Sequence, residues 1–229
     1  TLFRSHKIRK LSFYASGNQV AIIPDSLTKT SKWKRKKDSA KKQADEIVEE
    51  LLLSYAERSS VTRHGLSFDN EIENIFLSRF PFMDTPDQTK AWCEIREDLS
   101  DKNKPMNRLL CGDVGFGKTE IAIRTSFRVV FNGKQVAILA PTTILVNQLY
   151  LSFKERLVEF GVSVDVVSRF RTKGEITKIF ENIKQGKLDV VVGTHSLLSD
   201  KLEFSNLGLL IIDEEQRFGV NQKEKIQNI

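Results

Sequence analysis

The chain has 229 residues, of which 40% are hydrophobic and 29% charged, so it can bury a core of domain size. This composition excludes a disordered chain, a collagen-like chain and a small disulfide scaffold. No apolar run reaches the roughly 18 residues needed to span a bilayer, and we expect a soluble, cytoplasmic monomer without a membrane partner. Cys93 and Cys111 lack metal-ligand spacing, and we expect both to remain reduced thiols.

The net charge of +6 is distributed unevenly along the chain. Residues 1–64 hold 14 Lys and Arg against 7 Asp and Glu, whereas residues 65–229 hold 22 against 23. Seven of the basic residues crowd into positions 32–42. Such a run can attract phosphate, but it is commonly a solvated helix face, and both interpretations stay open.

Residues 1–64 are predicted to form two segments. Two β-prone pieces flank a turn within residues 1–23, which predicts the end of a small β-domain. Residues 24–64 are predicted to be a linker followed by a long amphipathic helix over about 34–58, because apolar residues recur there at helical spacing.

Residues 65–229 alternate short apolar runs with helical patterns, which is typical of an α/β fold with a parallel sheet and helices on both faces. Strands are predicted at 108–111, 135–140, 163–167, 189–192 and 207–212, and helices near 118–131, 143–160 and 173–186. Because ligands gather at the carboxyl ends of strands in such sheets, functional residues are expected there.

A glycine-rich stretch follows the first predicted strand and opens the next helix. It matches the phosphate-binding loop pattern in full, which predicts that ATP and Mg²⁺ are cofactors. Lys118 is expected to reach the β and γ phosphates, and Thr119 to offer its hydroxyl to Mg²⁺. Glu120 is expected to serve the helix start or water structure rather than catalysis. The predicted nucleotide-binding residues are Gly112, Asp113, Val114, Gly115, Phe116, Gly117, Lys118, Thr119 and Glu120.

Acidic residues follow the last predicted strand. Asp213 is predicted to hold Mg²⁺, and Glu214 to position or deprotonate the attacking water. With Lys118 they form the predicted catalytic set. An acidic patch that only caps the strand is the alternative interpretation.

The order of these motifs resembles that of superfamily 2 helicases. Motifs I, Ia, Ib and II correspond to residues 112–119, Ala140-Pro141-Thr142-Thr143, Gly193-Thr194-His195 and Asp213-Glu214-Glu215-Gln216. Upstream, Phe80-Pro81-Phe82 and Thr85-Pro86-Asp87-Gln88 resemble the adenine-reading element of that superfamily. The resemblance implies that Gln88 pairs with the base edge and that Phe82 stacks on it. Ordinary core packing is the alternative for Phe80 and Phe82.

Three longer stretches resemble the bacterial transcription-repair coupling factors more closely: residues 112–120, Ser168-Arg169-Phe170-Arg171 and residues 213–220. The RecG branch-migration translocases are the nearest alternative, and Phe116 together with residues 168–171 favours the coupling factors. The resemblance implies the first RecA-like lobe of a double-stranded DNA translocase that acts on stalled RNA polymerase and recruits nucleotide excision repair proteins.

The same resemblance implies how the ends of the chain are used. Residues 1–23 would end a polymerase-interacting domain, and the helix at 34–58 would connect it to the motor. The chain stops before motif III and the second lobe, so we interpret it as a piece of a larger protein. On its own it is expected to be nearly inactive.

DNA contacts are predicted at strand ends, where hydroxyls and helix amides can bind backbone phosphates independently of sequence. Helix capping is the alternative for the threonines at 142 and 143, a structural histidine for His195 and solvated side chains for the arginines. Gln216 replaces the histidine usual in motif II and is predicted to couple the nucleotide site to the other lobe without a titratable ring. The predicted DNA contacts are Thr142, Thr143, Arg169, Arg171, Gly193, Thr194 and His195.

Two further classes of function remain as alternatives. A phosphate-loop kinase or small GTPase would share the loop but would not need the motifs at 193–195 and 213–216. A non-catalytic polymerase-binding module would not need Lys118, Thr119, Asp213 and Glu214 intact.

Overall fold

The computed structural model describes residues 34–43, 45, 48, 65–67, 70–101, 104–113, 115–199, 201–218 and 222. The chain divides into two units, residues 1–58 and 59–229. In the first unit, residues 34–43, 45 and 48 are helical and exposed. The β-strands predicted within 1–23, the linker at 24–33 and the rest of the helix predicted to 58 lie outside the described residues.

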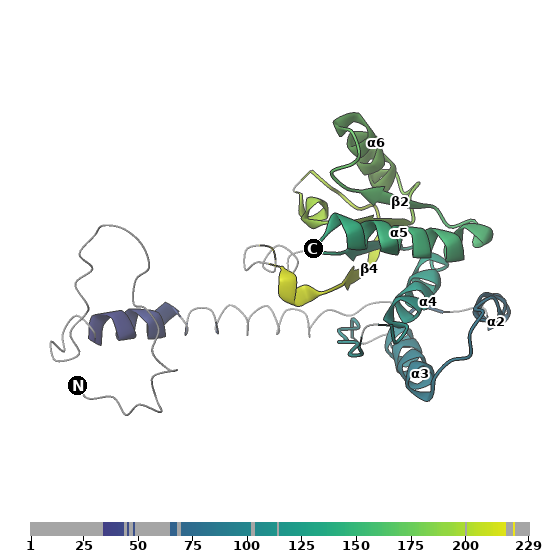
Figure 1. Cartoon of the computed structure of the whole chain (residues 1–229), viewed down its shortest axis with the longest axis horizontal. Helices are drawn as coiled ribbons and strands as arrows, with labels where there is room; N and C mark the ends of the chain where they lie inside the picture. Colours follow the sequence, from purple (N-terminus) through teal and green to yellow (C-terminus); the bar gives the residue numbers. More distant parts are fainter. Residues whose placement is uncertain are drawn as a thin grey trace, which may run out of the picture. The chain divides into compact units, whose positions relative to one another are not determined.

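The second unit is an α/β domain with one parallel sheet, as the sequence predicts (Figure 1). The strands lie in the order β2-β3-β1-β4. Short 3-10 turns, η2 (Val158–Phe160), η3 (His195–Leu198) and η4 (Glu215–Arg217), follow α5, β3 and β4. The longer elements are α2 (Asn70–Ser78), α3 (Pro86–Ser100), α4 (Lys118–Val130), β1 (Gln135–Leu139), α5 (Thr143–Leu157), β2 (Val164–Val167), α6 (Lys173–Lys184), β3 (Val190–Gly193) and β4 (Leu207–Ile212).

The two central strands explain the apolar runs in the sequence. Every residue of β1 and β3 is buried, because helices cover both faces of the sheet. Val136 of β1 pairs with Val190 of β3 on one side and with Leu209 of β4 on the other.

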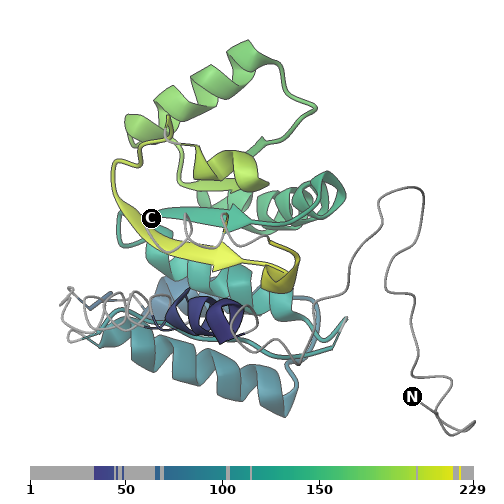
Figure 2. The ribbon, with the colours of Figure 1, turned by 90° about the vertical axis from the view of Figure 1, so that its left-hand side faces the viewer.

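The side chains of the sheet pack into two hydrophobic cores, one on each face, because successive residues of a strand point to opposite faces. Val136 and Ile138 join a core that includes residues of α3, α4 and α5. Ala137 and Leu139 join the other core, with residues of α6 and η3. In Figure 2, α6 accordingly lies on one side of the sheet and α3 and α4 on the other.

The strand predicted at 108–111 is wrong for this structure. Residues 105–113 have no regular secondary structure, and the described strands number four. Arg108 instead pairs with Asp98, 2.7 Å away, and with Glu94, both on α3. Leu109 is 81% exposed. Among the described residues, this segment therefore contacts α3 through ion pairs and forms no backbone ladder with β4.

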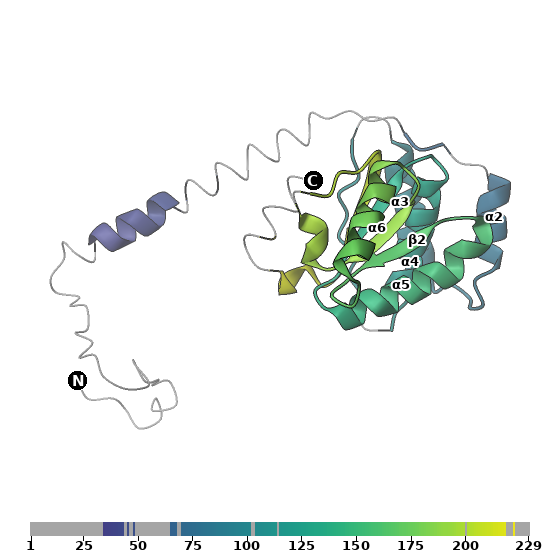
Figure 3. The same ribbon diagram turned by 90° about the horizontal axis from the view of Figure 1, so that it is seen from above.

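Three glycines mark the turns that lead from a helix into the next strand. Gly133, Gly161 and Gly186 have φ values of 71°, 75° and 67°, which are left-handed. Glycine reaches this conformation without a steric penalty, and it commonly ends helices in this way. These turns enter the strands at their amino ends, so the loops that leave the carboxyl ends lie at the other edge of the sheet (Figure 3).

Candidate nucleotide and nucleic-acid site

The phosphate-loop residues form a turn in front of α4. Gly115 and Gly117 have left-handed φ values of 86° and 75°, and the amide of Phe116 donates to the carbonyl of Asp113 at 3.4 Å. Gly117 is the N-cap of α4, where no side chain caps the helix. Amides at such a helix start, together with the helix dipole, favour binding of an anion. Val114 lies outside the described residues.

Lys118 folds back over the loop that precedes it. Its ammonium group donates to the carbonyl of Asp113 at 2.8 Å and also to the carbonyl of Gly112. Its charge also lowers the pKa of Asp213, although that is the smallest influence on this carboxyl. Lys118 is therefore near enough to Asp213 for its charge to act on that carboxyl.

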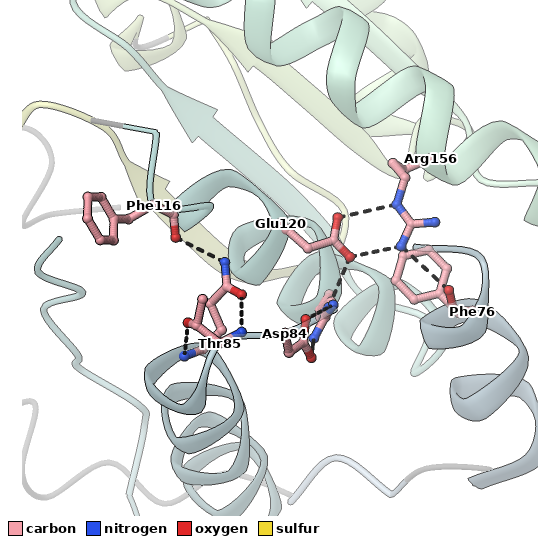
Figure 4. Close-up of polar contacts among 8 residues, drawn as sticks. Phe76, Asp84, Thr85, Phe116, Glu120 and Arg156 are labelled. Carbon is pink, nitrogen blue, oxygen red and sulfur yellow. Dashed lines mark hydrogen bonds and ion pairs between the residues drawn. The ribbon is translucent and has the colours of Figure 1, made fainter. Parts of the chain in front are cut away.

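Gln88 joins the start of α3 to the phosphate loop through hydrogen bonds to Thr85 and Phe116, both labelled in Figure 4. Its side-chain oxygen accepts from the amide of Thr85 at 2.8 Å, and the Thr85 hydroxyl accepts from the amide of Gln88 at 3.3 Å. This pair is a capping box, with Thr85 as the N-cap. The Nε2 group of Gln88 donates to the carbonyl of Phe116 at 3.0 Å. The predicted base-reading residue thus lies beside the loop.

Glu120 lies in an ion network rather than on the loop (Figure 4). It is 7% exposed, and its Oε1 accepts from Arg124 Nε at 2.9 Å and from Arg156 Nη2 at 2.8 Å. Arg124 also pairs with Asp84. The expectation that Glu120 contacts nucleotide gains no support, because both arginines hold its carboxylate between α4 and α5. The sequence pattern alone did not identify Asp84, Arg124 or Arg156.

The two phenylalanines before α3 have different surroundings. The ring of Phe80 lies 5.0 Å from the Arg124 guanidinium and 5.6 Å from that of Arg156. Phe82 is 72% exposed and meets Phe80 edge to face, with centroids 5.4 Å apart. Core packing is therefore wrong for Phe82, and the exposed ring is open to stacking on a base.

The acidic residues leave β4 at its carboxyl end. The amide of Asp213 donates to the carbonyl of Leu139 at 2.8 Å, which fixes its backbone beside β1. Burial, and then repulsion from Glu214, raises the pKa of Asp213 above its usual range. Two acids held close together in this way form a favourable place for a cation.

Glu214 has a strained backbone and a restrained side chain. Its φ of 53° and ψ of 47° are left-handed, a conformation that costs a non-glycine residue about 1–3 kcal/mol. Its Oε2 accepts from Gln216 Nε2 at 2.6 Å and lies 3.6 Å from Arg217 Nε. Gln216, the predicted coupling residue, therefore contacts the predicted catalytic carboxylate directly.

Residues predicted to contact DNA follow β1 and β3. The hydroxyl of Thr142 accepts from the amide of Leu145 at 3.3 Å, so Thr142 caps α5, as the alternative interpretation has it. Thr143 is half-buried at the first position of α5. Thr194 is buried, whereas His195 is exposed, which argues against a buried structural role for this histidine. Gly193 ends β3, and an added Cβ would lie 2.7 Å from Leu197.

The two arginines after β2 differ in how far they are engaged. Arg171 pairs with Asp165 at 3.0 Å and with Glu175 at 3.1 Å, and the hydrogen bond to Glu175 is the main cause that raises its pKa. Arg169 is exposed, and its guanidinium lies 5.3 Å from the ring of Phe170, which is 73% exposed. Arg171 thus anchors the loop that presents Arg169 and Phe170.

In the part of the chain that the structure describes, no helix is long and apolar enough to cross a membrane.

Comparison with curated proteins finds transcription-repair-coupling factors. That of Bacillus subtilis (strain 168) is 47% identical over 199 residues, which is 87% of this chain and 17% of the relative. That of Borreliella burgdorferi is 47% identical over 197 residues, which is 86% of this chain and 17% of the relative. The resemblance seen in the motifs is thereby confirmed, and the chain spans about one sixth of the length of these relatives.

Comparison with solved structures supports the same fold. RecG bound to a three-way DNA junction matches with a TM-score of 0.67 and 38% identity, over 72% of this chain and 22% of that chain. A hypothetical ATP-dependent RNA helicase from Sulfolobus tokodaii matches with a TM-score of 0.51 and 20% identity, over 69% and 45%, which shows the fold alone. The family model described as DEAD/DEAH box helicase matches residues 85–229, well over half of the sequence. The chain belongs to the DEAD/DEAH box helicase family.

Proposed function

We propose that this chain is the ATP-binding lobe of a double-stranded DNA translocase of the coupling-factor type, which acts on stalled RNA polymerase and couples transcription to excision repair. One observation carries the proposal. A single edge of the sheet presents the acidic pair Asp213 and Glu214 and, after β1, β3 and β2, the segments proposed to meet DNA. The charge of Lys118 also acts on Asp213, as the smallest influence on the pKa of that carboxyl.

The nucleotide half of the site follows from the loop. The amides at the start of α4 and the Lys118 ammonium hold the phosphates, and the Phe82 ring and Gln88 amide face the base. The Thr119 hydroxyl and the Asp213 carboxylate would hold Mg²⁺, which neutralises charge on the phosphates. Glu214 orients the attacking water once its carboxylate exchanges the Gln216 amide for that water.

The nucleic-acid half of the site uses the neighbouring strand ends. The amide-rich start of α5, His195 and Arg169 provide hydrogen-bond donors and positive charge for backbone phosphates. None of these groups is placed in a pattern that reads base edges. We therefore propose DNA binding that is independent of sequence and weakened by salt.

The polymerase and repair partners are proposed from the relatives. Transcription-repair-coupling factor is the printed name of relatives at 47% identity, of which this chain covers 17%. Contacts with repair proteins would use regions that this chain does not cover, whereas residues 1–23 would end the domain that contacts polymerase. The lobe alone is expected to bind ATP weakly and to hydrolyse it very slowly, because a second lobe would supply an arginine finger worth about 10³ to 10⁵ in rate.

The test is ATP turnover by the parent protein, with and without double-stranded DNA, for the unchanged protein and its Glu214→Gln variant. DNA-stimulated turnover that falls by a factor of about 10² or more in the variant is expected, because a positioned base contributes that much. Glu215→Gln is the matched control, since Glu215 is an exposed neighbouring acid in η4. ATP turnover that is the same with and without double-stranded DNA would overturn the translocase proposal.

A branch-migration helicase like RecG is the second candidate, favoured by the 38% identity to the RecG structure. The two functions differ in the substrate that the parent protein remodels. Release of a stalled polymerase from a linear template supports the first proposal. Reversal of a branched junction without polymerase release supports the second.

A further inference from the structure

Arg124 of α4 clamps the segment in front of α3 to the phosphate-loop helix, by pairing with Asp84 and Glu120, which are labelled in Figure 4. Its Nη1 and Nη2 donate to Asp84 Oδ2 and Oδ1 at 2.6 and 2.8 Å, a two-point contact that fixes orientation as well as distance. The Arg124 side chain is only 2% exposed. Burial by itself lowers the pKa of Arg124, but its hydrogen bonds to Asp84 and Glu120 and their negative charges outweigh burial, so the pKa is raised.

The clamp acts one residue away from the capping box. Asp84 immediately precedes Thr85, whose amide donates to Gln88 Oε1, while Gln88 Nε2 donates to the carbonyl of Phe116. A donor on one side and an acceptor on the other admit only one orientation of the amide. One Nε2 hydrogen and one oxygen lone pair then remain for a ligand.

That remaining pair matches one purine better than the other. Adenine presents an N6 donor beside the N7 acceptor, which a glutamine amide can bind with both of its groups. Guanine presents two acceptors, O6 and N7, at the same edge. A flipped or freely rotating amide would lose this discrimination.

Two contacts along one face of α4 hold Gln88 and its surroundings. At the start of α4, Gly117 lies so close to Gln88 that an added Cβ would be 2.2 Å from Nε2. Two turns later on the same face, Arg124 holds Asp84. Glu120 lies between them and ties Arg124 to Arg156 of α5. The segment that carries Gln88 is therefore held both at the turn in front of α4, through Phe116, and along α4 itself, through Arg124.

We propose that Arg124 is a positioning residue for base selection, which keeps the Gln88 amide in the orientation that prefers adenine over guanine. The inference rests on the proposed nucleotide site, whose phosphates are held separately by Lys118. Loss of the clamp should therefore change which base is preferred more than it changes the grip on the phosphates.

The experiment compares the affinity of the parent protein for ATP and GTP, both labelled with a fluorophore on the ribose, in Arg124→Lys, Arg124→Met and Asp84→Asn variants. The ATP-over-GTP preference is expected to fall roughly tenfold in each, as the loss of one oriented hydrogen bond implies. Binding of inorganic tripolyphosphate is expected to stay unchanged. Arg124→Lys and Asp84→Asn keep the result interpretable if Arg124→Met fails to fold.

Arg128→Met is the matched control, because Arg128 is a second buried arginine one turn further along α4. It contacts Glu73 at 3.4 Å and Ser100 at 2.8 Å, and Ser100 is the last residue of α3, at the opposite end of that helix from Gln88. This variant is expected to lower stability and to keep the ATP-over-GTP preference.

Three results would overturn the inference. An unchanged preference in Arg124→Lys and Asp84→Asn with intact binding would overturn the positioning role alone. An equal loss of the ATP-over-GTP preference in Arg128→Met would show that the change comes from a general destabilisation of α4 and not from the contact between Arg124 and Asp84. The third result would refute the proposed nucleotide site itself, and the inference that rests on it. It would be seen if the unchanged protein bound neither nucleotide, or if the Lys118→Ala variant bound ATP as tightly as the unchanged protein.

Discussion

At the residue scale, Asp213 is a carboxyl group whose ionisation the fold disfavours. Burial first, and then the charge of Glu214, raises its pKa, so the folded state holds a proton more tightly than the unfolded state does. Above the usual pKa of an aspartate, ionisation therefore lowers the free energy of unfolding, and this cost is fully present once the pH exceeds the raised value.

We accordingly expect Asp213→Asn to unfold at a higher urea concentration than the unchanged chain at about pH 7. Asparagine stays uncharged, so it avoids the cost of ionisation at every pH. The gain should shrink as the pH falls through the raised pKa and disappear near about pH 3, where both residues are neutral. A variant less stable at neutral pH would show that the carboxylate stabilises the fold instead.

The sequence predicts a site residue when its role depends on neighbours within a short motif, and not when its role depends on a residue far away in the chain. Lys118, Thr119 and Gln88 stand in short motifs whose spacing carries the chemistry, and the structure places Lys118 and Gln88 in contact with the loop. The pairing of Arg124 with Asp84 joins positions 40 residues apart. No short pattern encodes such a contact, because it depends on how α3 packs on α4.

At the element scale, the junction between the phosphate loop and α4 is the most constrained point of the site. Gly117 needs glycine for two reasons, its φ of 75° and its close approach to Gln88. Gly115 has a similar φ of 86°, but an added Cβ there would meet nothing within 4 Å. Substitution of Gly115 therefore tests backbone strain alone, whereas substitution of Gly117 tests strain together with a steric clash.

We expect Gly115→Ala to lower stability by about 1–3 kcal/mol through strain alone. Gly117→Ala should cost more than Gly115→Ala and should also weaken ATP binding, since it pushes the Gln88 amide away from Phe116. Urea unfolding and nucleotide titration of both variants check this. Equal effects of the two substitutions on ATP binding would contradict a specific role for the Gln88 contact.

Elements were predictable where periodicity was strong and a backbone ladder could form. The helices α4, α5 and α6 and the strands β1 to β4 lie close to their predicted positions, because their apolar residues repeat with the period of the element. The segment 108–111 is just as apolar, but Arg108 gives it an alternative partner in Asp98 and Glu94 of α3. The spacing of apolar residues along the sequence cannot predict whether such a segment pairs as a strand or makes ion pairs with a helix.

At the scale of the whole molecule, Arg169 is an exposed positive charge near the carboxyl ends of the strands, where the proposed DNA surface lies. Its neighbour Arg171 is held by Asp165 and Glu175 and stabilises the loop instead. Exposed Lys184, in the last turn of α6 near the opposite edge, pairs with Glu203.

We expect Arg169→Ala to weaken double-stranded DNA binding by the parent protein and to reduce the slope of log affinity against log salt by about 1, as loss of one phosphate contact does. Lys184→Ala removes the same charge from the other edge and should leave the slope unchanged. Equal slopes for all three proteins, measured by fluorescence anisotropy, would remove Arg169 from the proposed DNA surface.

The glycine turns at 133, 161 and 186 lie at the amino ends of the strands, away from the carboxyl ends where the proposed nucleotide and DNA sites lie. A cysteine introduced at the exposed Lys187, next to the last of these turns, would carry a tether on the side away from the strand ends. Once the exposed Cys93 and Cys111 are replaced, a lobe immobilised through that point would present its proposed nucleotide and DNA faces to solution in one orientation.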